Sequence, residues 1–164
     1  MSSPLRARIL VLSDAAASGR REDRSGPAVR ELLQERGWIV EGLEILPDEA
    51  DRIQGMLLAW TEGDDCDAVF TSGGTGLAPR DVTPEATRAV IDKEVPGLAE
   101  LMRAEGIKHT PRAALSRGIV GARRDKLIVN LPGSPRGACE SLQSIIELLP
   151  HVIDLLRGRT EHPG

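Results

Sequence analysis

Short apolar runs alternate with amphipathic helical stretches through the first half of this 164-residue chain. The run at 9–12 is typical of a strand buried on both faces. A second strand with an irregular middle is predicted over 38–40 and 43–46, and a third strand is predicted at 67–71. A helix opening at Pro27 is predicted between the first two runs. A second helix is predicted between the next two, because its apolar residues recur at helical spacing (Ile53, Met56, Leu57 and Trp60). The pattern predicts an α/β fold of three layers, with a mostly parallel sheet and helices on both faces.

The second half of the chain adds helices and one hairpin. Helical patterning resumes at 83–92 and 97–105, and a final helical region is broken or restarted at Pro150. Residues 118–131 resemble a hairpin with a charged turn, which we expect as a small extension of the sheet. We predict a single domain over 5–158, with flexible ends at 1–4 and 159–164.

Composition excludes several classes of protein. The formal net charge is −4 and aromatic residues make up 2 % of the chain, which argues against nucleic-acid binding. No apolar run is long enough to span a membrane. The two cysteines and three histidines lack the spacing of a zinc site or a disulfide scaffold. These features predict a cytoplasmic domain of enzyme size.

The most informative segment follows the third predicted strand and reads Thr71-Ser72-Gly73-Gly74-Thr75-Gly76. Three glycines let backbone N–H groups approach an anion closely, and the hydroxyls add donors. The segment matches neither a Walker A loop nor a dinucleotide fingerprint. A tight turn is the alternative, but a turn needs fewer glycines, so the segment favours phosphate or nucleotide binding.

Two acids lie near predicted strand ends. Asp81 stands just before a helix start that Thr83 can cap, so it is a candidate Mg²⁺ ligand; the alternative is a solvated acid paired with Arg80. Asp48 follows Leu46 and Pro47, and by spacing it suits the N-cap of the next helix slightly better than a site.

Two further loops carry candidate ligand contacts. Ser134 can cap a helix that presents N–H groups to a phosphate, and Asn130 can either contact a heterocycle or tie the loop down. Ser13 and Asp14 begin a loop that either lines the same crevice or is simply polar. No nucleophile–base pair is visible, so positioning and metal electrostatics would supply the catalysis.

These motifs together resemble the molybdenum-cofactor biosynthesis domain, in particular the stand-alone molybdopterin adenylyltransferases. The resemblance covers about residues 8–157. It is carried by Thr71 to Gly76 and by Arg80-Asp81-Val82-Thr83-Pro84-Glu85-Ala86-Thr87. Further matching segments are Ser13-Asp14, Ser18-Gly19, Asp23 to Pro27, Leu46 to Glu49, Ala114 to Arg117 and Asn130 to Pro135.

The resemblance implies that ATP and molybdopterin give adenylylated molybdopterin and pyrophosphate, with Mg²⁺ required. It assigns catalysis and the metal to Asp48 and Asp81, which raises Asp48 above the spacing argument. It implies that Ser13, Asp14 and the glycine-rich segment (Thr71, Ser72, Gly73, Gly74, Thr75 and Gly76) bind the nucleotide. Residues expected near molybdopterin are Ser116, Asn130, Pro132, Gly133 and Ser134. A homotrimer or hexamer and the molybdenum-inserting enzyme as a partner are also implied.

One position departs from the family pattern, which often has a basic residue directly after Ser13-Asp14. This chain has alanine at 15–17, so substrate binding would weaken unless Arg20, Arg21 or Arg24 substitutes. The main alternative function is a paralogue that binds molybdopterin as a carrier without adenylylating it. The metal-inserting enzyme shares the domain but needs further domains, and the domain of nicotinamide-nucleotide amidases usually lacks the 132–135 loop.

Overall fold

A single six-stranded sheet forms the centre of the computed structural model, which describes residues 3–161. The expected flexible ends include residues 1–2 and 162–164, which lie outside the described residues. The strand order is β2-β1-β3-β6-β5-β4. The strands are β1 (Arg6–Leu12), β2 (Ile39–Leu46), β3 (Ala68–Ser72), β4 (Lys93–Glu94), β5 (Val120–Arg123) and β6 (Lys126–Leu131).

The sheet is mostly parallel, as predicted. β1 pairs in parallel with β2 and β3, and β3 pairs in parallel with β6. The predicted hairpin is β5 and β6, which pair antiparallel and extend the sheet beyond β3. The short strand β4 was not predicted; it pairs antiparallel with β5 and completes that edge.

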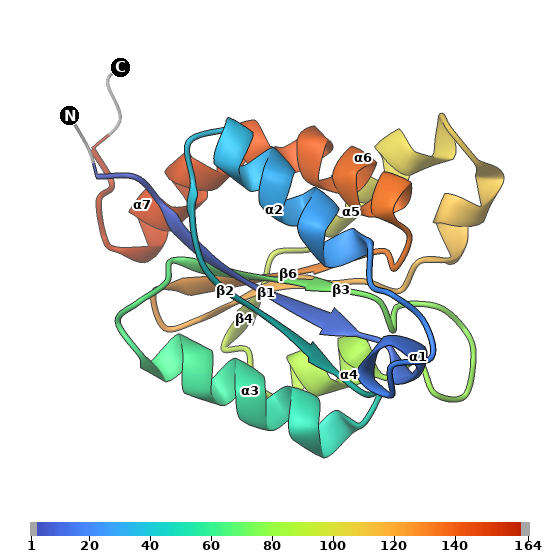
Figure 1. Cartoon of the computed structure of the whole chain (residues 1–164). Helices are drawn as coiled ribbons and strands as arrows, with labels where there is room; N and C mark the ends of the chain where they lie inside the picture. Colours follow the sequence, from blue (N-terminus) through green and yellow to red (C-terminus); the bar gives the residue numbers. More distant parts are fainter. Residues whose placement is uncertain (1–2, 162–164) are drawn as a thin grey trace.

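Helices cover both faces of the sheet (Figure 1). One layer contains α2 (Ser25–Glu35), α5 (Pro96–Ile107), α6 (Pro135–Ile145) and α7 (Leu149–Leu156). The other contains α3 (Ala50–Glu62) and α4 (Thr83–Arg88). Two short 3-10 helices, η1 (Pro111–Leu115) and η2 (Ile146–Leu148), precede β5 and α7. The three-layer α/β prediction is confirmed.

Each face of the sheet has its own apolar core, because successive strand residues point to opposite sides. In β1, Ile9 and Val11 pack with α2, α5, α6 and α7, whereas Leu10 and Leu12 pack with α3 and α4. Trp38 meets the edge of Phe70 in the first core, with ring centroids 5.6 Å apart. Continuous apolar strands are therefore the consequence of two covered faces.

Several helix boundaries differ from the predictions for local reasons. α2 begins at Ser25 rather than Pro27, because the Asp23 carboxylate accepts hydrogen bonds from the Ser25 and Gly26 N–H groups. The predicted 13–26 loop contains a helical turn, α1 (Asp14–Ala17), whose first N–H groups are capped by Ser13. α4 ends at Arg88 rather than near residue 92.

The carboxyl ends of β1, β2, β3 and β6 meet at one edge of the sheet, beside α1 (Figure 1). This is the edge at which ligands bind in open α/β sheets. Between residues 3 and 161, none of the helices has the length and apolar character needed to cross a membrane.

We predict that Ile53→Ala lowers the free energy of unfolding by roughly 3 kcal/mol, because the Ile53 side chain on α3 is fully buried and its truncation leaves a cavity. The matched control is Ile107→Ala at the exposed end of α5, which should cost less than about 1 kcal/mol. Urea unfolding of both variants measures the difference. Equal losses would contradict the assignment of Ile53 to the core.

Candidate functional site

The glycine-rich segment after β3 has a backbone that only glycine tolerates at two positions. Gly73 and Gly74 have φ angles of 104° and 70°, in the left-handed region. A Cβ added to Gly73 would overlap the Leu12 carbonyl oxygen, and one added to Gly74 would overlap the Thr83 hydroxyl oxygen. Both glycines are therefore required by close approach as well as by backbone conformation.

Hydrogen bonds tie this segment to its neighbours. The Gly73 N–H donates to the Leu131 carbonyl over 3.1 Å, and the Thr83 hydroxyl donates to the Gly73 carbonyl over 2.9 Å. The Ser72 hydroxyl donates to the Pro132 carbonyl over 2.8 Å. The prediction that Thr83 caps α4 is wrong: Val82 occupies the N-cap position, and the Thr83 hydroxyl holds the glycine-rich segment.

Two clefts adjoin the glycine-rich segment. The first cleft has a volume of about 660 Å³ and lies between the carboxyl end of β1, the start of α2 and the glycine-rich segment. It brings together many of the residues predicted from the sequence: Ser13, Asp48, Ser72, Gly73, Gly74, Asp81, Gly133 and Ser134.

The second cleft has a volume of about 440 Å³ and lies between the glycine-rich segment, η1 and the start of α6. Predicted residues that line it without lining the first cleft are Thr75, Gly76, Ser116 and Pro132. The two clefts share four lining residues, which we call the junction: Gly74, Asp81, Gly133 and Ser134. Ser134 also caps α6 as predicted, accepting a hydrogen bond from the Gly137 N–H over 3.0 Å.

Asp14 and Asp48 join the ends of β1 and β2 through reciprocal hydrogen bonds. Each carboxylate accepts from the other residue's backbone N–H, over 3.0 and 3.1 Å. Arg80 donates two hydrogen bonds to the Asp14 carboxylate, which lower the pKa of Asp14.

Two predictions for these residues are wrong. Arg80 pairs with Asp14 and not with Asp81. Asp48 is not an N-cap, because α3 starts after Glu49 without a side-chain cap. Asp14 itself lines neither cleft.

The second carboxylate oxygen of Asp48 is buried and has no hydrogen-bond partner within the described chain. It lies beside Gly74: a Cβ there would be 3.0 Å from it. Burial is the main cause of a raised pKa at Asp48, and the nearby charges of Asp14 and Asp81 raise it further. A buried carboxylate oxygen without a donor is a suitable ligand for a hard cation.

The acidic side chains of the first cleft suit a cation that is bound partly by the protein and partly by a phosphate of the substrate. Among residues 3–161, no three His, Cys, Asp or Glu side chains are grouped to hold a metal by themselves. Mg²⁺ is usually bound by one or two carboxylates together with substrate phosphates. Asp48 and Asp81, which both line the first cleft, fit that donor set.

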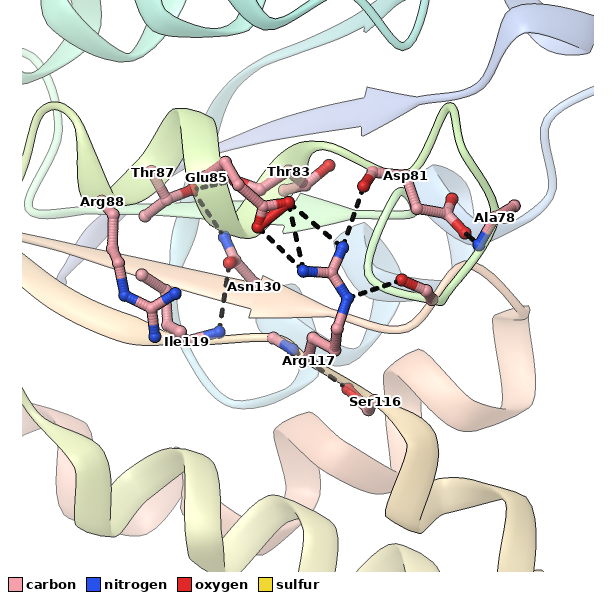
Figure 2. Close-up of polar contacts among 12 residues, drawn as sticks. Ala78, Asp81, Thr83, Glu85, Thr87, Arg88, Ser116, Arg117, Ile119 and Asn130 are labelled. Carbon is pink, nitrogen blue, oxygen red and sulfur yellow. Dashed lines mark hydrogen bonds and ion pairs between the residues drawn. The ribbon is translucent and has the colours of Figure 1, made fainter.

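Arg117 fixes the loop that carries Asp81 (Figure 2). Its guanidinium donates to the Gly76 carbonyl over 2.8 Å and to the Asp81 carbonyl over 2.9 Å. It also pairs with the Glu85 carboxylate, whose pKa it lowers. At the Asp81 side chain, one carboxylate oxygen accepts from the Ala78 N–H over 3.0 Å. The Asp81 loop is thus held at both ends by hydrogen bonds.

The side chain of Asn130 is used entirely inside the fold. Its amide donates to the hydroxyls of Thr71 and Thr87, each over 3.0 Å, and its carbonyl accepts from the Ile119 N–H. Figure 2 shows it between α4 and the start of β5. Of the two roles open from the sequence, the structure supports tying the elements together. Thr71 is buried as its partner and lines neither cleft.

Two positioning residues were not found by sequence reasoning. Arg80 lies 66 residues from Asp14, and Arg117 lies 41 residues from Gly76. Arginine beside a motif acid gives no local signal of which distant group it will hold. Only the fold, which brings the loops after β1, β2 and β3 to one edge, defines these pairs.

The geometry is that of an α/β protein with two clefts beside a glycine-rich segment at the carboxyl edge of its sheet. A family model described as "Probable molybdopterin binding domain" matches residues 8–151. The chain belongs to this molybdenum-cofactor biosynthesis family, which confirms the resemblance seen in its motifs.

Named relatives match over most of their length. A Helicobacter pylori protein named molybdopterin adenylyltransferase is 43% identical, with 92% of this chain and 86% of that protein covered. The Escherichia coli protein of the same name is 38% identical, covering 94% and 86%. A solved Thermus thermophilus structure, titled as the molybdopterin biosynthesis enzyme MoaB, has a TM-score of 0.89 and 50% identity, covering 94% and 97%. These relatives are named as enzymes, which agrees with the enzymatic function that the sequence motifs predicted for this chain.

We predict that Arg117→Lys speeds amide hydrogen exchange in residues 76–85 by roughly tenfold, because an ammonium group cannot hold both carbonyls and Glu85 together. The matched control is Arg88→Lys, because Arg88 lies on α4 with Glu85 but forms an exposed pair with Glu94 of β4. Unchanged exchange in the Arg117 variant would contradict the role of this residue in fixing the loop.

We predict that Asp48→Asn stabilises the protein at about pH 7, because the raised pKa means that folding disfavours the charged carboxylate. The amide oxygen of asparagine can still accept from Asp14. The gain should be complete above the raised pKa and should vanish as pH falls below the ordinary aspartate value of 3.8. Urea unfolding at a series of pH values measures this gain in stability. The control is Glu44→Gln, which changes an exposed acid on β2. A variant less stable than the parent at pH 7 would contradict the prediction.

Proposed function

We propose that this protein transfers AMP from ATP to the terminal phosphate of molybdopterin, releasing pyrophosphate. The observation that carries the proposal is the junction, where two clefts of substrate size share Gly74, Asp81, Gly133 and Ser134. A transfer between two bound substrates requires that their reacting atoms meet at such a boundary. The names of the relatives support molybdopterin as one substrate and transfer of an adenylyl group to it, and ATP as the donor of that group follows from the family resemblance.

We assign ATP to the first cleft and molybdopterin to the second. The first cleft contains the backbone of Gly73 and Gly74 together with Asp48. The second contains Ser116 and Pro132, which the family resemblance associates with molybdopterin. Thr75 and Gly76, expected at the nucleotide, line the second cleft instead and are reassigned to molybdopterin.

The start of α6 supports the placement of a phosphate at the junction. The helix runs from Pro135 to Ile145, and its N-cap Ser134 is a junction residue. Unpaired N–H groups at a helix N-terminus favour negative charge. Gly133 lies close to Gly73, since a Cβ on Gly133 would be 3.3 Å from the Gly73 Cα. The reacting phosphates would therefore be held between two backbone segments.

Asp48 and Asp81 would hold Mg²⁺ together with the nucleotide phosphates. When bound, the ion would offset the negative charge of the triphosphate and of the leaving pyrophosphate. Asp14 and Arg80 keep Asp48 in place through hydrogen bonds, and Arg117 keeps the Asp81 loop in place. These residues would therefore act by positioning the two acids.

The chemistry needs no protein nucleophile. An oxygen of the molybdopterin phosphate would form a bond to the α-phosphorus of ATP, and the bond between that phosphorus and the bridging oxygen to the β-phosphate would break. Pyrophosphate would leave with the electron pair. A phosphate nucleophile is already ionised near pH 7, so a strong general base is unnecessary. Alignment of the two substrates across the junction would supply most of the rate enhancement.

Assembly, location and partners are carried over from the family resemblance. We propose that the protein acts in the cytoplasm as a homotrimer or hexamer. Its product would be passed to the molybdenum-inserting enzyme.

The test is AMP transfer from ATP to molybdopterin with Mg²⁺, comparing the parent protein with Asp81→Asn. We expect turnover in the parent and a loss of at least about 100-fold in kcat in the variant, because a ligand of the Mg²⁺ ion that would hold the reacting phosphates is lost. Asp51→Asn, an exposed acid in the first turn of α3, is the control and should retain activity.

Binding of molybdopterin should be measured in the same proteins. A parent that binds molybdopterin tightly but transfers no AMP would contradict the enzymatic proposal and favour the carrier paralogue. An Asp81→Asn variant as active as the parent would remove Asp81 from the proposed site.

A further inference from the structure

Two arginines that line the first cleft have no side-chain partner among residues 3–161. Two other arginines near the site are paired with acids, Arg80 with Asp14 and Arg117 with Glu85. Arg21 and Arg24 line the first cleft, yet neither guanidinium makes a hydrogen bond or an ion pair to any group in the described chain. An unpaired arginine in a cleft is available to a ligand.

The acids beside these arginines do not neutralise them. The Asp23 carboxylate accepts from the Ser25 and Gly26 N–H groups and from the Ser25 hydroxyl, so its oxygens are used at the start of α2. Glu22 also lines the cleft, but it forms no ion pair with either arginine. The local sequence thus keeps two positive charges free at one wall of the cleft.

Arg21 and Arg24 are the only cationic side chains among the residues that line the first cleft in the described chain. The same cleft contains the carboxylates of Asp48 and Asp81, which repel a phosphate chain when no cation intervenes. α1 contributes only Ala16 to the lining, so it supplies no charge. Any anion bound in this cleft would find its side-chain cations in the 21–24 segment.

The position of Arg21 and Arg24 relative to the junction determines which phosphate groups they can bind. Neither arginine lines the second cleft, and neither is a junction residue. A phosphate reacting with a molecule in the second cleft must lie at the junction. The phosphates that Arg21 and Arg24 reach would therefore be the ones that do not react.

We propose that Arg21 and Arg24 bind the β- and γ-phosphates of the nucleotide, and so hold the pyrophosphate that leaves. Guanidinium groups bind phosphate oxygens through charge-assisted hydrogen bonds, often two at a time. The inference rests on the proposed function, since it assumes that a nucleoside triphosphate occupies the first cleft. It supplies the positive charge that alanine at 15–17 does not provide.

The test is calorimetric binding of ATP, AMP and inorganic pyrophosphate to the full chain in the presence of Mg²⁺. Arg21→Ala and Arg24→Ala should each weaken binding of ATP and pyrophosphate by roughly tenfold. Binding of AMP should change by less than about twofold, because AMP lacks both distal phosphates. Arg30→Ala is the matched control, because Arg30 also has no side-chain partner in the described chain but lines neither cleft.

Each outcome distinguishes the inference from the proposed function. Equal loss of ATP and AMP affinity would contradict the assignment to the distal phosphates. Unchanged ATP affinity in both variants would remove the arginines from the site while leaving the proposed function intact. A parent protein that binds no ATP would overturn the proposed function and this inference with it. Loss of affinity in Arg30→Ala as well would indicate a general charge effect and contradict a specific contact.

Discussion

The close approach of Gly73 and Gly74 to their neighbours is the constraint on which the site depends. These two residues lie against the Leu12 carbonyl at the end of β1 and against Thr83 at the start of α4. The Gly73 N–H and carbonyl are both paired, to Leu131 and Thr83. One turn of backbone therefore joins three strand ends and a helix start, and it forms part of both clefts. A side chain at either position would separate those elements and change both clefts together.

The two acids Asp14 and Asp48 at this edge differ in how well the fold stabilises their charges. The Asp14 carboxylate accepts hydrogen bonds from Arg80 and from the Asp48 N–H, and these bonds lower its pKa, so its negative charge stabilises the fold. Asp48 has one buried oxygen without a donor, and its pKa is raised. Partly unsatisfied polar groups of this kind concentrate at functional sites, because a ligand completes them. The contrast between these two acids is the reason why we propose Asp48, and not Asp14, as the acid that binds a ligand.

Sequence periodicity predicted the layers and the parallel strands, and with them the sheet edge at which the two clefts lie, because apolar patterning follows directly from burial on two faces. It could not predict pairings that depend on tertiary contacts. Thr83 and Asp48 have the composition of helix caps, yet their side chains are used by the Gly73 carbonyl and the Asp14 N–H. Asn130 is polar and lies near the end of β6, and its partners come from β3, from α4 and from Ile119, just before β5. Local propensity favours the nearest partner, whereas the fold offers a better one at long range.

In our proposal the two substrates occupy separate clefts and meet only at the junction. Amide hydrogen exchange in the presence of each ligand alone would show which segments each one contacts. A non-hydrolysable ATP analogue should protect the start of α2 around residues 24–26, and molybdopterin should protect η1 and residues 112–116. Both ligands should protect the junction residues Gly133 and Ser134. Protection of the same segments by both ligands, with none at η1, would contradict the arrangement in two clefts.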